Sequence, residues 1–174
     1  MKYIISVVFI ISGCFLFSCK EKQATQQPNL TVDMKMLDSI RDHSDSTYTK
    51  PYKRTDFVTA EYFISKKDST ITQVMRDSAK NIRQVVVEKN KRRIYVAEFY
   101  PNGQLMFKNN LDDYGQFNGE SKGFYETGIL KRAGVYKNGF HFGKWKNYNE
   151  EGNYVSTEEY NENGQQEKIY IETQ

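Results

Sequence analysis

The sequence predicts an all-β protein: an elongated antiparallel β-meander of hairpin repeats, preceded by a flexible tether with a short helix. The first observation is that four Asn-Gly dipeptides interrupt stretches rich in aromatic and β-branched residues between positions 102 and 164. Asn tolerates and Gly freely adopts the positive φ of a type I′ turn, so such dipeptides indicate β-hairpins. The second is that thirteen Tyr and eleven Phe provide aromatic pairs that can pack across neighbouring strands.

The N-terminal residues 1–18 have the pattern of a signal peptide. Lys2 is followed by an apolar run over 3–17 that contains only four small or weakly polar residues. A transmembrane helix needs about 20 apolar residues, so this run is short for a span and typical of an export signal. We therefore expect the mature protein in the cell envelope.

The signal ends in Leu16-Phe17-Ser18-Cys19, which resembles a bacterial lipobox, where the cysteine is acylated and becomes the new N-terminus. The segment Ile11-Ser12-Gly13-Cys14 fits that pattern even better, but cleavage there would leave a very short signal and three apolar residues at the mature end. We favour lipid attachment at Cys19, with the outer membrane as the expected location. A secreted protein without lipid and an uncleaved anchor are the alternatives.

Residues 19–56 read as a tether. The segment is polar, and no glycine occurs between positions 20 and 102. Residues 32–43 place apolar side chains at partly helical spacing, which predicts a short helix within the tether.

Residues 57–99 are expected to form N-terminal β-hairpins. Strand-like runs cover 57–64, 69–75, 82–88 and 93–100. In the last of these, Tyr95, Ala97 and Phe99 alternate with Ile94, Val96 and Glu98, with the period of two expected of a strand.

Residues 100–174 carry a repeat in which a tyrosine precedes a turn glycine by three or four positions. The motif occurs five times, as Tyr100/Gly103, Tyr125/Gly128, Tyr136/Gly139, Tyr148/Gly152 and Tyr160/Gly164. Two longer units begin at Asn118 and Asn138, and in each of them a second glycine follows the first after four residues, at Gly123 and Gly143. Recurrence every 20 to 25 residues indicates an array in which each unit contacts only its neighbours.

The stretch from Tyr136 to Gly152, with both glycines of its unit and Trp145 in register, resembles the variant MORN repeat of the bacterial YwqK-like antitoxin family. The resemblance covers roughly residues 97–165. It implies an antiparallel meander with aromatic side chains stacked along one face. The unit at Gly119 departs from the pattern because Gln116 replaces the tyrosine. An exported lipoprotein does not meet a cytoplasmic toxin, so we do not expect an antitoxin role.

Residues suited to catalysis are sparse. His43 and His141 have no second histidine nearby, and both cysteines fall in the signal region. We therefore expect no catalytic residue, no metal or cofactor site and no enzymatic activity. Nucleic acid is not an expected partner of an envelope protein.

The aromatic stripe has two interpretations: a packed core, or an exposed face for a partner. The second interpretation proposes an interaction surface that comprises Phe140, Phe142, Trp145 and Tyr148. Clustered Trp and Tyr residues often dominate binding energies. The resulting hypothesis is a lipid-anchored protein that binds an envelope protein or glycan without catalysis. A structural spacer lipoprotein and an accessory subunit of a neighbouring envelope system are the alternatives.

Overall fold

The computed structural model describes residues 31–54 and 57–171, so the signal peptide and Cys19 lie outside the described residues. The described chain forms one helix and eleven strands. The elements are α1 (Thr31–Asp42), β1 (Ser46–Arg54), β2 (Phe57–Ser65), β3 (Thr70–Arg76), β4 (Ile82–Lys89), β5 (Arg92–Phe99), β6 (Leu105–Asn110), β7 (Gly119–Phe124), β8 (Leu130–Lys137), β9 (Phe140–Tyr148), β10 (Tyr154–Tyr160) and β11 (Gln166–Ile171).

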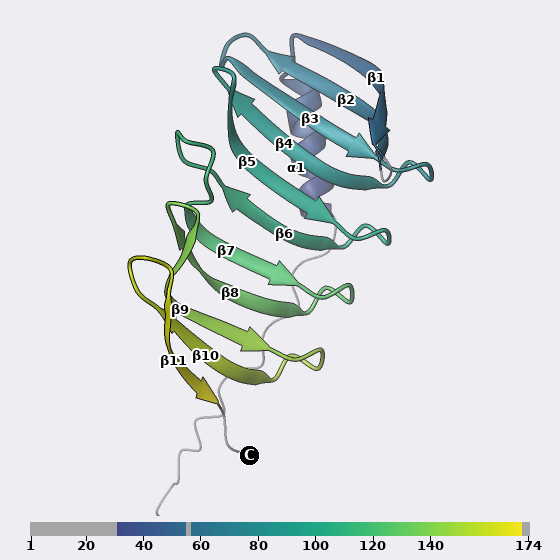
Figure 1. Ribbon diagram of the computed structural model, residues 1–174. Coiled ribbons are helices and arrows are strands. Elements are labelled where there is room, and N and C mark those ends of the chain that lie inside the picture. Colours follow the sequence, from purple (N-terminus) through teal and green to yellow (C-terminus); the bar gives the residue numbers. More distant parts are fainter. Residues whose placement is uncertain (1–30, 55–56, 172–174) are drawn as a thin grey trace, which may run out of the picture.

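Every strand pairs antiparallel with the next strand in the sequence, from β1 to β11, in a single sheet. The sheet is therefore a simple meander, elongated along the direction in which the strands succeed one another (Figure 1). The predicted all-β meander of hairpins is confirmed.

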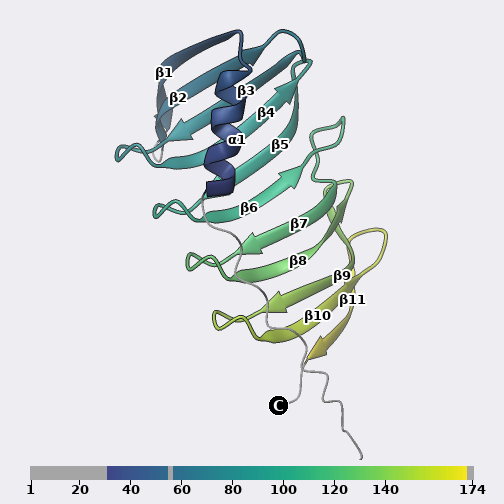
Figure 2. The ribbon, with the colours of Figure 1, turned by 180° about the vertical axis from the view of Figure 1, so that it is seen from behind.

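Helix α1 lies across one face of the N-terminal strands (Figure 2), and its bounds agree with the helix predicted over 32–43. Leu37 is 3% exposed and packs in a core whose other members come from β2 to β5. These members are Phe63, Val74, Val85, Ala97 and Phe99. The helix is thus part of the folded unit and covers one face of β2–β5.

Residues 46–54, expected to belong to the tether, instead form the edge strand β1. Its pairing with β2 runs from Ser46, opposite Ile64, to Arg54, opposite Phe57, with an irregularity after Pro51. Proline lacks a backbone donor, and an edge strand tolerates it because one side of the strand forms no ladder hydrogen bonds. The polar composition concealed this strand.

The Asn-Gly dipeptides form turns of two types. Asn138 and Gly139 have φ angles of 52° and 82° between paired residues of β8 and β9, as a two-residue type I′ turn requires. At Gly103 and Gly164 only the glycine has positive φ, and the loops are three residues long with a type I turn. The prediction of a hairpin turn is confirmed at all three places.

The prediction of a turn at Asn118-Gly119 is wrong. The β6–β7 hairpin turns earlier, at residues 112–116, where the Asp112 amide donates to the Gln116 carbonyl. The Asp112 carboxylate also accepts hydrogen bonds from the Tyr114 and Gln116 amides, which fixes this turn. Gly119 is the first residue of β7, and the amide of Asn118, immediately before it, donates to the Asn110 carbonyl.

The β5–β6, β7–β8 and β9–β10 turns lie along one side of the sheet (Figure 1), and tyrosine hydroxyls link them to one another. The Tyr100 hydroxyl donates to the Phe124 carbonyl at 2.9 Å, 24 residues further along the chain. The Tyr125 hydroxyl donates in the same way to the Tyr148 carbonyl at 2.9 Å, 23 residues further along. Tyr100 therefore links the β5–β6 turn to the end of β7, and Tyr125 links the β7–β8 turn to the end of β9.

Register divides the residues between the two faces of the sheet, because cross-strand partners share a face and successive residues alternate. Val74, Val85 and Ala97 are successive partners on the face that α1 covers. A second core of Ala60, Met75 and Val86 lies among the aromatic side chains of the opposite face. No described element covers this opposite face (Figures 1 and 2).

Candidate functional site

The helix-free face contains a groove of about 180 Å³ across β6–β9. The groove is lined by Phe107, Asn109, Phe117, Ser121, Gly123, Arg132, Tyr136 and Trp145. It exists because β7 and β8 present small residues here: Gly123 pairs with Phe107 and Arg132, and Ser121 pairs with Gly134. The larger side chains of β6, β8 and β9 project further from the sheet than these small residues and form the walls of the groove.

Aromatic rings form a continuous chain along the groove. Ring centroids lie 6.3 Å apart for Phe107 and Phe117, 5.3 Å for Phe117 and Tyr136, and 4.9 Å for Tyr136 and Trp145. The chain continues through His141, whose ring lies 4.2 Å from that of Trp145. Each aromatic pair contributes about 0.5–1.5 kcal/mol beyond area burial, so the wall of the groove is preorganised.

Trp145 belongs to the base of the groove. It is 2% exposed, and its indole Nε1 donates to the Val135 carbonyl at 3.1 Å. The Arg132 guanidinium lies over the indole at 4.5 Å from the ring centroid. A ligand in the groove would therefore meet Arg132 and the neighbouring rings before it met the indole.

The charge of Arg132 is balanced within the site. Its Nη2 lies 2.6 Å from Glu158 Oε2 and donates to the Tyr160 hydroxyl at 3.0 Å, and that hydroxyl donates to the same carboxylate oxygen at 2.6 Å. The hydrogen bond from Tyr160 and the charge of Arg132 lower the pKa of Glu158, against an opposing contribution from burial. Arg132 and Glu158 are therefore both ionised, and their charges cancel.

Two buried polar atoms of the groove have no hydrogen-bond partner within the described part of the chain: Asn109 Oδ1 and Arg132 Nε. Asn109 is 5% exposed. More than nine-tenths of buried polar groups in proteins are hydrogen-bonded, so this acceptor and this donor are exceptions that lie in one groove.

The four residues of the predicted interaction surface do not lie together. Trp145 is buried on the groove face, whereas Phe142 pairs with Val135 and Phe140 with Lys137 on the α1 side of the sheet. Phe140 is 58% exposed. Tyr148 contacts Tyr154, with ring centroids 6.2 Å apart.

The sequence interpretation grouped this run by its aromatic character and overlooked the period of two, which places Trp145 on the face opposite to that of Phe140 and Phe142. It also missed Asn109, Arg132 and Tyr136. Alternation within β6 and β8 is the signal that could have assigned these three to faces, but nothing in the sequence marks one face as the open one.

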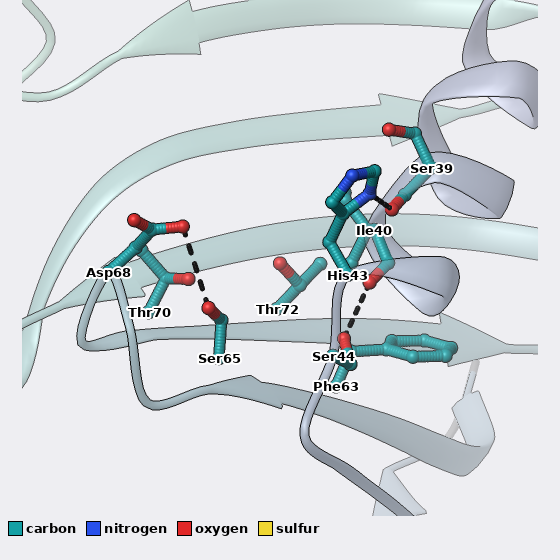
Figure 3. Close-up of a pocket in the computed structure, with 9 residues that line it drawn as sticks. All are labelled: Ser39, Ile40, His43, Ser44, Phe63, Ser65, Asp68, Thr70 and Thr72. Carbon is teal, nitrogen blue, oxygen red and sulfur yellow. Dashed lines mark hydrogen bonds between the residues drawn. The ribbon is translucent and has the colours of Figure 1, made fainter.

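A second cavity of about 160 Å³ lies between the C-terminal end of α1 and the β2–β3 hairpin (Figure 3). Its polar groups pair mainly with one another: His43 Nδ1 lies 2.7 Å from the Ser39 carbonyl oxygen, and the Ser44 hydroxyl donates to the Ile40 carbonyl. Asp68 lies on the far side of the cavity from His43 (Figure 3). The groove is therefore the stronger candidate.

Within residues 31–54 and 57–171, no group of three or more His, Cys, Asp or Glu side chains is placed to hold a metal ion. No helix in the same described ranges is long and apolar enough to cross a membrane.

The sequence matches no protein-family model and no curated protein. Among solved structures, a mutant of S. aureus TarM in complex with fondaparinux, alpha-GlcNAc-glycerol and UDP gives a TM-score of 0.36 at 10% identity over 65% of this chain. Accessory secretory proteins 1, 2 and 3 of Streptococcus pneumoniae give 0.35 at 15% identity over 78% of this chain. A second TarM structure gives 0.34 at 11% identity over 63%.

The matched region spans 24% of each of those chains. Scores at this level define neither a family nor an activity. What defines the class of this protein is its own geometry: an open, single-sheet β-meander with a polar and aromatic groove on the face that α1 leaves uncovered.

Proposed function

We propose that this chain is a lipid-anchored protein of the cell envelope whose meander binds a carbohydrate chain in the groove, without catalysis. The observation that carries the proposal is the pair of unpartnered buried atoms, Asn109 Oδ1 and Arg132 Nε, in a groove walled by aromatic rings. Pockets with mostly apolar walls and a few convergent polar groups are typical of ligand sites.

The chemistry of a sugar ring matches these groups. Sugar hydroxyls both donate and accept hydrogen bonds, so the hydroxyls of a sugar chain can satisfy both an acceptor such as Asn109 Oδ1 and a donor such as Arg132 Nε. The C–H face of the ring is apolar and can lie against Phe107, Phe117 or Tyr136, which are all partly exposed. Glu158 already balances the charge of Arg132, which favours a neutral ligand over an anion.

The size of the groove favours a polymer that is held one ring at a time. About 180 Å³ is below the roughly 300 Å³ at which pockets for drug-sized ligands begin. Because no described element covers this face of the sheet, the remainder of a longer chain has room to continue past the groove.

Envelope location and the repeat family are part of this proposal. The lipobox-like segment that ends at Cys19 supports anchoring. The tyrosine-linked turns, with hydrogen bonds that join residues 24 and 23 positions apart, support kinship with MORN-type repeats.

The test uses Trp145, the only tryptophan of the chain, as an intrinsic reporter beneath the groove. The mature protein is titrated with neutral oligosaccharides from bacterial envelopes while tryptophan emission is followed. Wild type should show a saturable change, and Asn109→Leu should abolish it. Removing an unsatisfied buried acceptor in favour of an apolar group of similar shape is nearly neutral or stabilising, so Asn109→Leu should retain the melting temperature.

Asn110→Leu is the matched control, because Asn110 is the exposed neighbour on the opposite face of β6 and should leave binding intact. Equal sugar binding by wild type and Asn109→Leu would remove the groove from the proposal. If no sugar binds, cross-linking in intact cells decides between the alternatives. A protein that wild type captures and Asn109→Leu loses would favour a protein ligand, and capture of nothing by either would favour the spacer.

A further inference from the structure

On the α1 side of the sheet, one row of cross-strand partners changes character at β6. Under the helix the row consists of Val74, Val85 and Ala97. It continues through Lys108 in β6, Lys122 in β7, Ala133 in β8 and Lys146 in β9. Each is the direct partner of the residue before it, and all three lysines are exposed. The apolar row thus becomes a basic row where the cover of α1 ends.

Positive charge dominates this part of the α1-side face. By strand alternation, the face carries one glutamate in β6–β9, Glu120, and at least five lysines. Five of these, Lys108, Lys122, Lys137, Lys144 and Lys146, form what we call the lysine face. In the described part of the chain, Lys137 is the member with an ion pair, at 3.9 Å from Glu162. Acidic side chains return in β10, where Glu159 is the cross-strand partner of Lys144, so the basic area ends there.

The arrangement is unfavourable for the isolated protein. Lys108 and Lys122 are direct cross-strand partners, and like charges in that position destabilise a sheet. Lysines often protect edge strands from aggregation, but β6 and β7 lie in the interior of the sheet, so this role does not account for them. An anionic surface laid against the row would turn the repulsion into attraction.

Apolar side chains accompany the lysines. Val135 is 37% exposed on the same face, and Phe140 is 58% exposed at its border. Lysine stems can lie along apolar surface while their ammonium groups reach outward, a combination that suits the headgroup region of a bilayer.

We propose that the lysine face docks on an anionic phospholipid surface, so that the groove on the opposite face points away from the membrane. The inference rests on the lipid anchor of the proposed function. Residues 20–30 join Cys19 to α1, and eleven extended residues reach at most about 40 Å. The tether is bonded to the first residue of α1, and α1 lies on the same side of the sheet as the lysine face. Basic residues near an anionic leaflet are attracted to it within a Debye length.

The test compares mature lipidated protein on vesicles of pure phosphatidylcholine with protein on vesicles that also contain phosphatidylglycerol. Acetylation of individual lysines is followed by mass spectrometry. Lys108, Lys122 and Lys146 should react several-fold more slowly on the anionic vesicles at low salt, and high salt should remove this protection. Lys67, exposed in the β2–β3 turn, is the internal control and should react equally on both.

The triple change Lys108→Glu, Lys122→Glu, Lys146→Glu should leave the protein on the vesicles through its anchor but abolish the protection of Lys137 and Lys144. Equal labelling of wild type on both vesicles would overturn the inference. So would protection by soluble polyphosphate alone that matches the protection by anionic vesicles, since the occupant would then be an anionic polymer. Failure of the protein to float with neutral vesicles refutes the anchor itself and is thereby distinguished from failure of the lysine face.

Discussion

Gly134 of β8 lies directly against the indole of Trp145 in β9. A Cβ atom at Gly134 would stand 2.2 Å from Trp145 Cδ2, far inside any real contact distance. The absence of a side chain at this position is what lets the indole close over the strand and donate to the Val135 carbonyl. The base of the groove therefore depends on a glycine that forms no turn.

We expect Gly134→Ala to lower the free energy of unfolding by about 1–3 kcal/mol, because overpacking forces the indole to shift. Gly123→Ala is the matched control on the neighbouring strand of the same face, where a Cβ would meet only the Met106 carbonyl oxygen at 3.8 Å. Urea denaturation followed by tryptophan emission measures both. Equal stability of the two variants would contradict the described packing of the Trp145 indole against Gly134.

Removing the hydroxyls that link successive turns should destabilise the meander. Tyr100→Phe and Tyr125→Phe each leave a carbonyl without its donor, at an expected loss of about 1 kcal/mol in unfolding free energy. Tyr114→Phe serves as the reference, since Tyr114 is 90% exposed and its loss should be close to zero. Thermal and urea unfolding provide the measurement, and three indistinguishable variants would argue against the linkage of turns by tyrosine.

His141 should make stability depend on pH. Burial lowers its pKa below the ordinary value of 6.5, and the charge of Arg132 lowers it further, against an opposing effect of Glu158. The unfolded chain therefore takes up a proton near pH 6.5 while the folded chain does not. The contribution of neutral His141 to the free energy of unfolding is complete above pH 6.5. It is lost as the pH falls through the lower pKa that His141 has in the folded state.

His141→Gln should flatten the unfolding free energy between pH 6.5 and about 5, above the range in which ordinary carboxylates titrate. The lowered pKa of Glu158 should remain visible as a further loss of stability below its ordinary value of 4.5. Urea titrations at several pH values separate the two windows. A pH dependence that is unchanged in His141→Gln above pH 5 would exclude this histidine as its source.

Membrane attachment should depend on Cys19 and not on Cys14. Cys19→Ala should abolish incorporation of labelled fatty acid and block signal cleavage, whereas Cys14→Ala should leave both intact. Metabolic labelling and the mass of the mature protein provide the readout. The opposite pattern would place the mature N-terminus at residue 14.

Local chemistry made part of the fold predictable from the sequence. Asn138 and Gly139 fit a type I′ turn through their own backbone preferences, strand-like runs marked β2 to β5, and the repeated turn glycines marked hairpins beyond residue 100. The turn between β6 and β7 was misplaced because two turn signals competed within a few residues. The Asp112 side chain, which accepts two backbone hydrogen bonds, prevailed over Asn118-Gly119.

The sequence by itself determined that this chain is a meander, because hairpins require only neighbours in sequence. Only the tertiary structure decided which face α1 covers and which residues lie in the open groove. A period of two assigns residues to two faces without ranking them, and register shifts such as the one between Ala133 and Val135 change which residues of neighbouring strands become partners. Asn109 and Arg132 became candidates for binding because eleven strands in fixed register place their unpartnered atoms in one groove.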